Sequence, residues 1–249
     1  MKAVLKRWTP APVWRLAHDA RAGLRSLRLR MRKPDVRSYQ GVSTIHCMDA
    51  LHTGIFAAAY EPHWRLDPYN LPSGGDRTRM RVYNICHFAR MALRAPGDFI
   101  CAGISWGIAA RVLFDFLDWP ETGRTLHLID PFLGVDNSVE RNPVEKYNAD
   151  ENFVRAQYPP GAAIAIHRAF IPDCFPLPNT GALAFAHLNT TDFRAEARSL
   201  DYLIHTLSPG GIIVIDGYAI GEGNAEIFRA ALTAEPFVLP TGQAVIAKP

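Results

Sequence analysis

From residue 98 onwards, short apolar runs alternate with segments whose apolar residues recur every three or four positions. The runs predict strands and the segments predict helices. We expect strands at 98–102, 124–129, 162–167, 182–188 and 211–215, and helices at 106–118, 145–157, 193–206 and 222–233. Each run is apolar at nearly every position, which is typical of parallel strands covered on both faces. The pattern therefore predicts an α/β fold built on a doubly wound, mostly parallel sheet.

The end of the chain follows a different pattern. Residues 237–239 and 244–247 are two short apolar runs that flank Pro240-Thr241-Gly242-Gln243. Two strands separated by such turn-forming residues are typical of a hairpin. We therefore expect a sheet of seven strands that ends in an antiparallel hairpin.

The part of the chain before residue 96 predicts helices rather than strands. The segments 42–60 and 77–94 have helical spacing, and Asp76 would cap the second one. Between them, residues 61–75 contain too many Pro and Gly for regular structure. We expect three parts: a helix and linker at 1–41, a helical cap over a substrate at 42–95, and a sheet domain at 96–249.

The charge of the chain is concentrated in its first 33 residues. This segment has ten Lys and Arg against one Asp, a net charge of +9, which leaves −6 for the rest of a chain whose total is +3. Its apolar residues have helical spacing, so a basic amphipathic helix is expected. We expect it to pack on the protein's own acidic body or on a second subunit. The alternative is peripheral contact with an anionic membrane surface.

Composition limits the class of protein further. The chain is 48% hydrophobic and 20% charged, an ordinary globular balance. Its four cysteines form no C-x-x-C pair, which favours reduced thiols over a disulfide frame or zinc site. No apolar segment typical of a secretory signal follows the basic N-terminus, and no basic pattern interleaved with aromatic residues is present. We expect a cytoplasmic homo-oligomer with no nucleic-acid partner.

Two strand ends carry residues that suit a nucleotide-type ligand. The first strand runs into a loop with the spacing Gly103-x-x-x-Gly107, and the second ends at Asp130. Such a loop lets backbone N–H groups approach a charged ligand, and an acid at this place can accept hydrogen bonds from ribose hydroxyls. The spacing differs from the G-x-G-x-x-G of dinucleotide sites and suits S-adenosylmethionine better. An ordinary strand-to-helix turn and a nicotinamide-dependent oxidoreductase are the alternatives.

Four short motifs occur in a fixed order along residues 77–249. They are Gly97-Asp98-Phe99-Ile100-Cys101-Ala102-Gly103, Leu128-Ile129-Asp130-Pro131-Phe132-Leu133-Gly134, Leu207-Ser208-Pro209-Gly210-Gly211 and Ile215-Asp216-Gly217-Tyr218. This ordered set resembles the macrocin O-methyltransferase family, a branch of the class I S-adenosylmethionine-dependent methyltransferases. The resemblance implies a Rossmann-like methyltransferase sheet and O-methylation of a sugar hydroxyl on a glycan or glycosylated natural product.

The resemblance and the strand ends together indicate candidate site residues. The residues expected to bind the cofactor are Cys101, Gly103, Ser105, Trp106, Gly107, Asp130, Arg168, Ala169, Phe170 and Asn189. Transfer to a hydroxyl also requires a base. Asp216, at the end of a central strand, and His167, near another strand end, are the candidate catalytic residues.

The chain also departs from the family's pattern. The family's Mg²⁺ ligands are three acids, and Asn189 and Gly217 occupy the places of two of them. Cys101 stands where the family has a glutamate. Since Mg²⁺ prefers charged oxygen ligands, we expect no functional metal. The lost acids also leave an alternative open, in which a degenerate methyltransferase fold serves as a binding or partner subunit.

Overall fold

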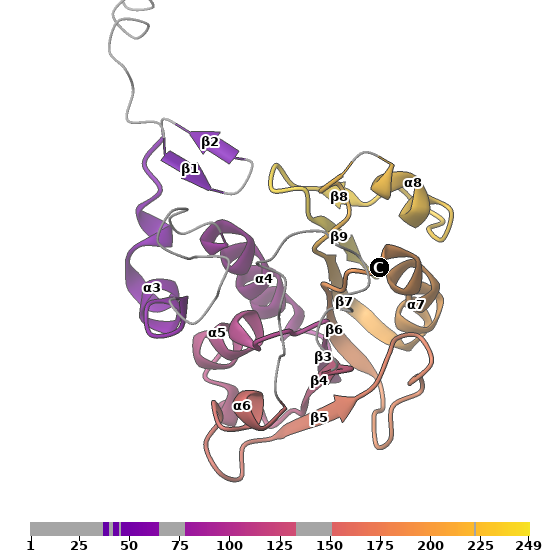
Figure 1. The fold of residues 1–249 in the computed structure, drawn as a ribbon, viewed down its shortest axis with the longest axis horizontal. Helices are drawn as coiled ribbons and strands as arrows, with labels where there is room; N and C mark the ends of the chain where they lie inside the picture. The colour runs from indigo at the N-terminus through magenta and orange to yellow at the C-terminus, as the bar shows by residue number, and fades with distance from the viewer. Residues whose placement is uncertain (1–36, 40–41, 45, 65–77, 133–150, 222) are drawn as a thin grey trace, which may run out of the picture. The chain divides into compact units, whose positions relative to one another are not determined.

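The computed structural model describes residues 37–39, 42–44, 46–64, 78–132, 151–221 and 223–249. Its main feature is a seven-stranded sheet in the order β5-β4-β3-β6-β7-β9-β8 (Figure 1). The strands are β3 (Asp98–Ala102), β4 (Leu126–Asp130), β5 (Ile164–Arg168), β6 (Leu183–Leu188), β7 (Leu207–Ile215), β8 (Phe237–Val238) and β9 (Ala244–Ala247). Strands β3 to β7 are parallel, and β9 is antiparallel to both of its neighbours. This confirms the predicted fold class and its antiparallel end.

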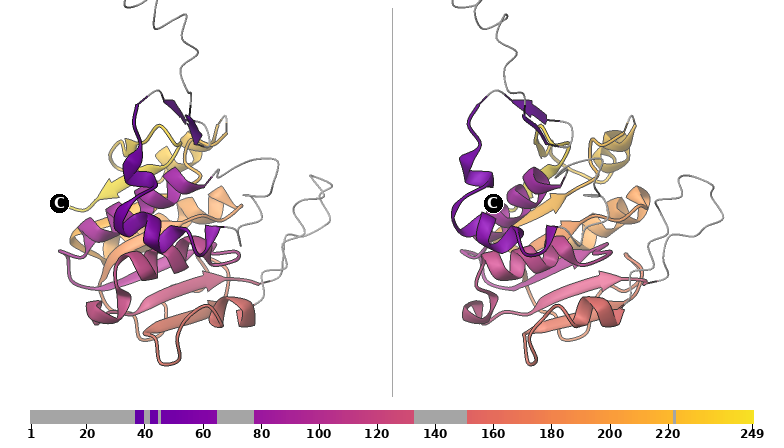
Figure 2. Two further views of the ribbon diagram at one scale, coloured as in Figure 1. Left: turned by 90° about the vertical axis from the view of Figure 1, so that its left-hand side faces the viewer. Right: turned by 60° about the vertical axis from the view of Figure 1, so that its left-hand side comes forward.

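Helices cover both faces of the sheet (Figures 1 and 2). One face carries α3 (Gly54–Tyr60), α4 (Arg79–Ala92), α5 (Ile108–Phe116) and α6 (Glu151–Arg155), and the other carries α7 (Phe193–Thr206) and α8 (Asn224–Arg229). Side chains of each strand alternate between two cores. Phe99 and Cys101 point to the core under α4 and α5, whereas Ile100 and Ala102 point to the core under α7. Burial on both faces explains why the strands are apolar throughout.

The helices before the sheet share its core. Val82, Ile85 and Ala89 of α4 lie in the same buried cluster as Phe99 of β3 and Leu113 of α5. Helices α3 and α4 therefore cover one face of the sheet. The predicted domain boundaries and the role of 42–95 as a substrate cap stay predictions.

The N-terminal part differs from the expected helix at 42–60. Residues Val42–Thr44 form strand β2, which pairs with β1 (Arg37–Tyr39) in a second, two-stranded sheet. A short 3-10 helix, η1 (Asp49–Leu51), follows, and α3 begins only at Gly54. The prediction was wrong for 42–44 and 46–53. Val42 and Thr44 are β-branched and favour a strand.

Several predicted helix ends also shift. Helix α5 begins at Ile108 because Gly107, at φ 77°, has a left-handed backbone that stops the helix extending backwards. Helix α4 has Thr78 as its N-cap, and the expected cap at Asp76 lies outside the described residues. So do residues 145–150 of the expected helix at 145–157 and the basic segment 1–33. The helix predicted at 193–206 is confirmed at both ends.

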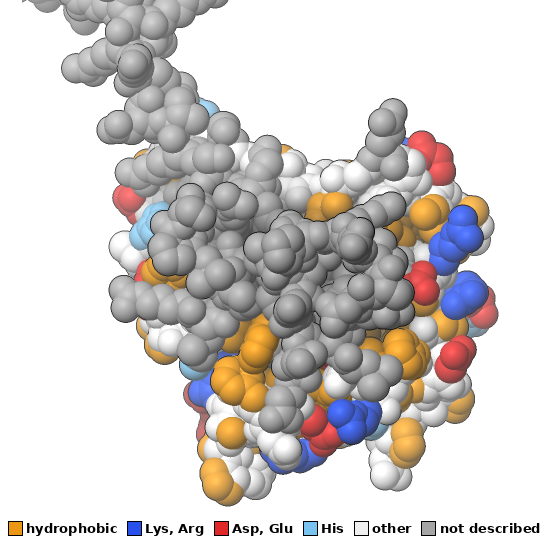
Figure 3. Space-filling model, viewed as in Figure 1, with side chains coloured by type: hydrophobic (Ala, Val, Ile, Leu, Met, Phe, Trp, Pro, Cys, Tyr) orange, Lys and Arg blue, Asp and Glu red, His pale blue; other side chains and the backbone are white. Residues whose placement is uncertain are grey.

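The surface over α7 and α8 carries charges of both signs (Figure 3). Arg229 pairs there with Glu226 and Glu235, and exposed pairs of this kind contribute little to stability. The edge strand β8 has only two residues, Phe237 and Val238, and both are exposed.

Within the described part of the chain, no helix is both long enough and apolar enough to span a bilayer.

Candidate cofactor and acceptor site

The carboxyl ends of the central strands meet at one edge of the sheet. The N–H of Gly103, after β3, donates to the Ile129 carbonyl at 2.9 Å, and the N–H of Asn189, after β6, donates to the Ala102 carbonyl at 2.9 Å. The N–H of Asp216, after β7, donates to the Leu188 carbonyl at 2.8 Å. The structure therefore brings most predicted site residues to this edge, where ligands of open α/β sheets bind.

Asp130 holds two loops together at this edge. Its Oδ2 accepts from the N–H of Ser105 at 2.9 Å, and its Oδ1 accepts from the N–H of Phe132 at 2.9 Å. Ser105 and Phe132 both have φ 51°, a left-handed conformation that is uncommon outside glycine. Burial raises the pKa of the Asp130 carboxyl, and the backbone N–H groups oppose this shift. The N–H of Ile104 also bonds this carboxylate. A carboxylate has about four acceptor sites, so one remains to which a ribose hydroxyl could donate.

The two glycines of the loop act through their backbone geometry. Gly103 has φ 75°, and a Cβ atom at this position would collide with the Asn189 carbonyl. The N–H of Gly103 already donates to the Ile129 carbonyl, and that of Gly107 donates to the Ile104 carbonyl at 2.8 Å. Both N–H groups are therefore engaged within the protein, and contact of the loop with a cofactor stays a prediction.

Two further predicted cofactor residues, Cys101 and Trp106, have buried or half-buried side chains. Cys101 is 1% exposed in the core under α4, and burial raises the pKa of its thiol to about 12. A cofactor contact by this buried side chain is not supported. Trp106 is half-buried, and its ring packs edge-on against Phe153 with centroids 5.3 Å apart. Its carbonyl accepts from Gln157 Nε2 at 2.8 Å, which joins the loop to the residues after α6.

Three of the predicted cofactor residues, Arg168, Ala169 and Phe170, gather beside Asp130. Arg168 is the β5 partner of Asp130 in the parallel ladder, and the N–H of Ala169 donates to the Asp130 carbonyl at 3.2 Å. Phe170 follows directly and is 57% exposed. An exposed aromatic ring two residues past the partner of the acid offers a surface on which a purine could stack.

Asp216 is buried, and both of its carboxylate oxygens are engaged. Oδ2 lies 2.5 Å from Nη2 of Arg81, a residue of α4. Oδ1 accepts from Nε2 of Gln243 at 2.5 Å. The side chain is almost fully buried and is paired with the Arg81 guanidinium, so an acceptor hydroxyl has little access to it, and the geometry does not favour Asp216 as the general base.

The residues at the positions of the family's metal ligands do not fit a divalent cation. A Cβ atom at Gly217 would lie 2.5 Å from the Phe193 ring, so the ring fills the place of a second acid. Asn189 is exposed and supplies an amide rather than a carboxylate. Asp192 accepts from the N–H groups of Arg194 and Ala195 as the N-cap of α7. Within the described ranges, no group of three or more His, Cys, Asp or Glu could hold a metal ion.

His167 is far from Asp216. Its Nε2 lies 3.0 Å from Nδ1 of His127, and the two rings stack. Three strands separate β5 from β7, which corresponds to about 19 Å at a spacing of about 4.8 Å per strand. The partner of His167 in the ladder, Ile129, lies in the core under α7, whereas Val214, two residues before Asp216, lies in the opposite core. His167 and Asp216 therefore cannot act on one proton.

The His127–His167 pair should make the protein sensitive to acid. Burial lowers the pKa of both imidazoles, Asp98 partly opposes this for His127, and His127 adds to it for His167. The unfolded chain therefore binds more protons than the folded one below about pH 6.5, and stability should fall as the pH drops through that value. Between about pH 7.5 and about pH 5.5, the melting temperature of His167→Gln should therefore fall less than that of the parent.

The exposed His205 provides the control for this measurement, because its side chain is 78% exposed on α7. His205→Gln should leave the acid profile of the parent unchanged. If His167→Gln and the parent lose stability in parallel, the histidine pair is not what the acid acts on.

Three buried polar residues at this edge were not predicted from the sequence. Arg81 and Gln243 contact Asp216, and Glu196 is fully buried on α7 with its Oε1 accepting from the N–H of Thr190. A signal was present for two of them. Arg81 precedes Ile85 by four residues, and Glu196 precedes Leu200 by four, so each lies on the apolar face of its helix. A charged residue at such a position indicates a buried partner.

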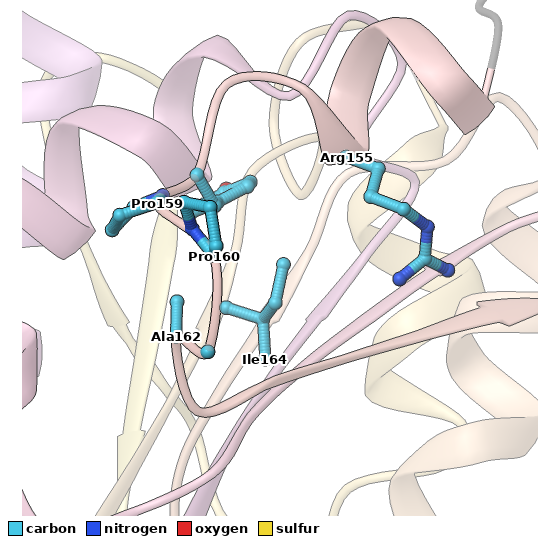
Figure 4. Close-up of a pocket in the computed structure, with 7 residues that line it drawn as sticks. Arg155, Pro159, Pro160, Ala162 and Ile164 are labelled. Atoms are coloured by element: carbon cyan, nitrogen blue, oxygen red, sulfur yellow. The ribbon is translucent and has the colours of Figure 1, made fainter.

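A shallow pocket lies away from these residues (Figure 4). It is lined by Arg155, Tyr158, Pro159, Pro160, Gly161, Ala162 and Ile164. Ile164 begins β5, whereas Arg168, the partner of Asp130, ends it. The pocket is therefore at the opposite end of the strand from the candidate site.

Comparisons with known proteins agree with this architecture. No family model matches the chain. Over 139 residues the chain is 32% identical to 8-demethyl-8-(2,3-dimethoxy-alpha-L-rhamnosyl)-tetracenomycin-C 4'-O-methyltransferase of Streptomyces olivaceus, a match that covers 53% of this chain and 48% of that protein. The chain thus spans about half the length of this curated relative.

Two solved structures are similar in fold. The O-methyltransferase NovP has a TM-score of 0.60 at 17% identity, over 80% of this chain and 97% of NovP. The Podospora anserina methyltransferase PaMTH1, solved with SAH bound, has a TM-score of 0.51 at 13% identity, over 77% of this chain and 88% of PaMTH1. The strand order and these likenesses show that the chain has the class I methyltransferase fold. The predicted resemblance to class I O-methyltransferases is thus confirmed for the fold.

Proposed function

We propose that this protein is an S-adenosylmethionine-dependent O-methyltransferase. The observation that carries the proposal is Asp130 at the end of β4, which holds the Gly103–Gly107 loop through the N–H of Ser105 and still has an acceptor site for a ribose hydroxyl. The strand order, with β9 antiparallel between β7 and β8, agrees with it. The named activities of the Streptomyces olivaceus relative and of NovP support the same class.

The residues at the edge of the sheet fit the parts of this cofactor. Asp130 would hold the ribose, and the exposed Phe170 with Arg168 and Ala169 would lie along the adenine. The loop at Gly103–Gly107 would pass close to the methionine part. PaMTH1, whose fold is similar, was solved with the demethylated form of the cofactor.

The proposed reaction is an in-line displacement at a methyl group. The cofactor supplies a methyl group on a sulfonium, whose sulfur keeps the electron pair when the carbon–sulfur bond breaks. The acceptor oxygen forms the new bond to carbon, and its proton passes to a base or to water. Holding the two reactants in line can by itself contribute about 7–11 kcal/mol to the lowering of the barrier. We infer that positioning is the main contribution of this chain, because Asp216 is engaged and His167 lies far away.

The acceptor that we propose is a sugar hydroxyl on a glycosylated natural product. The name of the Streptomyces olivaceus relative places its methyl group on a rhamnosyl unit of a tetracenomycin. A role as a partner subunit remains the second candidate, because two of the three acids that bind Mg²⁺ in the family are absent here. The homo-oligomer, the cytoplasmic location and the role of residues 1–33 stay predictions.

Asp130→Ala tests the cofactor site. The substitution removes charge-assisted hydrogen bonds to the ribose, so the affinity for S-adenosylhomocysteine should fall by roughly 1–3 kcal/mol. Isothermal titration calorimetry measures this loss, and Asp201→Ala, an exposed acid on α7, is the matched control. Equal affinity of Asp130→Ala and the parent would refute the assignment of this strand end. Binding without methyl transfer to any glycoside would favour the partner subunit.

A further inference from the structure

Arg81 places a positive charge at the end of β7. It lies on α4, four residues before Ile85, on the face that packs on the sheet. Its Nη2 lies 2.5 Å from Asp216 Oδ2 and donates to the Asp216 carbonyl at 2.8 Å. The Arg81 and Asp216 side chains are only 8% and 7% exposed. The guanidinium therefore binds the carboxylate and the backbone of the same residue out of contact with water.

Gln243 fixes the other oxygen of this carboxylate. Its Oε1 accepts from Asn84 Nδ2 at 2.9 Å and from Thr241 Oγ1 at 2.7 Å. Its Nε2 therefore faces the other way and donates to Asp216 Oδ1 at 2.5 Å and to the Arg81 carbonyl at 3.2 Å. Turning the amide over would break all four bonds. Asp216 is thus oriented from both sides by residues of α4 and of the turn before β9.

This arrangement occupies the place where a divalent cation would have to bind Asp216. A cation such as Mg²⁺ binds carboxylate oxygens at about 2.0–2.1 Å and needs several such ligands. At Asp216 it would have to displace a hydrogen bond on one oxygen and approach a guanidinium on the other. Like charges at such a distance repel, and removing one partner of a buried pair is costly. Phe193 fills the space beside Gly217, so a second acid at that position would not fit without movement of the ring.

We infer that Arg81 is a resident cation of this site, which balances the charge of Asp216 in place of a divalent ion and keeps such an ion out. Arg81 is a positioning residue here, because it acts on the proposed acceptor site through Asp216. The inference rests on the proposed function only in treating the ends of β6 and β7 as part of the site. An ion pair that only stabilises the fold would not alter how the protein responds to cations.

The response to cations tests this inference. We would compare the parent, Arg81→Gln, Arg81→Lys and the double variant Arg81→Gln/Asp216→Asn, using Mn²⁺ binding by electron paramagnetic resonance and melting curves with and without millimolar Mg²⁺. Arg81→Gln should bind Mn²⁺ at least tenfold more tightly than the parent, and Mg²⁺ should raise its melting temperature. The double variant and Arg81→Lys should behave like the parent. A folded Arg81→Gln with no gain in Mn²⁺ affinity would overturn the inference.

If Arg81→Gln does not fold, Mn²⁺ binding by the parent and by Asp216→Asn tests the inference instead. Mn²⁺ binding to the parent that is lost in Asp216→Asn would overturn the inference, and equal binding by these two proteins would support it. Calorimetry with S-adenosylhomocysteine in the presence of EDTA keeps the proposed function separate. If this ligand fails to bind while the cation results hold, the proposed function fails and the role of Arg81 stands.

Discussion

Replacing Glu196 with glutamine should stabilise the protein at alkaline pH by up to about 3 kcal/mol. The Glu196 side chain is fully buried, and burial raises the pKa of its carboxyl to about 7. The N–H of Thr190 opposes this shift, whereas Asp216 and Asp192 add to it. One oxygen, Oε2, is buried without a hydrogen-bond partner among the described residues. Above pH 7 the parent therefore holds a buried charge that glutamine never acquires.

The sign of the effect follows from the two pKa values of Glu196. The unfolded chain releases this proton near pH 4.5, whereas the folded protein keeps it up to about pH 7. Between these values the folded state binds more protons, so the free energy of unfolding of the parent falls as the pH rises. The advantage of Glu196→Gln should be near zero below pH 4.5, grow through this window and become constant above it.

Urea unfolding at several pH values measures this profile. Glu226→Gln, on the exposed face of α8, is the matched control and should follow the parent throughout. If Glu196→Gln is no more stable than the parent at about pH 8, the buried charge carries no cost and the expectation fails.

Among substitutions that add one methyl group in the candidate site, Gly103→Ala should lower the stability of the protein most. At φ 75° the added Cβ atom would collide with the backbone of Asn189 and Thr190, neither of which is the end of a flexible side chain. A left-handed alanine costs about 1–2 kcal/mol, and overpacking typically costs about a further 1–3 kcal/mol. We expect a loss of roughly 2–5 kcal/mol in the free energy of unfolding. Because the loop must move, the affinity for S-adenosylhomocysteine should also fall at least about tenfold.

Gly161→Ala separates the two contributions. Gly161 has a similar φ of 79°, but nothing lies within 4 Å of an added Cβ atom. This variant should lose only the backbone part, about 1–2 kcal/mol, and should bind the ligand like the parent. Similar losses of stability in the two variants would show that the contact between the β3 and β6 loops is less tight than the structure indicates.

Local patterns were sufficient to predict the sheet. Strands that are buried on both faces are apolar throughout, so β3 to β7 were identifiable from the sequence alone, and α7 was predicted at both ends. The prediction failed at 42–44 and 46–53, where a strand and a short 3-10 helix precede α3 and periodicity alone does not separate them. The strand ends also brought Asp130, Gly103 and Asn189 together as expected, because parallel strands end at one edge.

The partners of the site residues could not be predicted in this way. Asp216 was identifiable as a strand-end acid, but Arg81 lies 135 residues before it and Gln243 lies 27 residues after it. No local periodicity links such positions. For the same reason the separation of His167 from Asp216 needed the strand order, which places β4, β3 and β6 between them.

The position of β9 has a consequence for how the chain assembles as it is synthesised. Strand β9 is inserted between β7 and β8, although it leaves the ribosome after both. Until β9 docks, β7 has an open edge, β8 has no strand to pair with, and the turn that carries Gln243 cannot reach Asp216. The bond from Gln243 to the Arg81 carbonyl spans 162 residues, and contacts of such long range slow folding. The nascent protein should therefore expose an unpaired sheet edge, which chaperones recognise, until residues 243–247 have emerged.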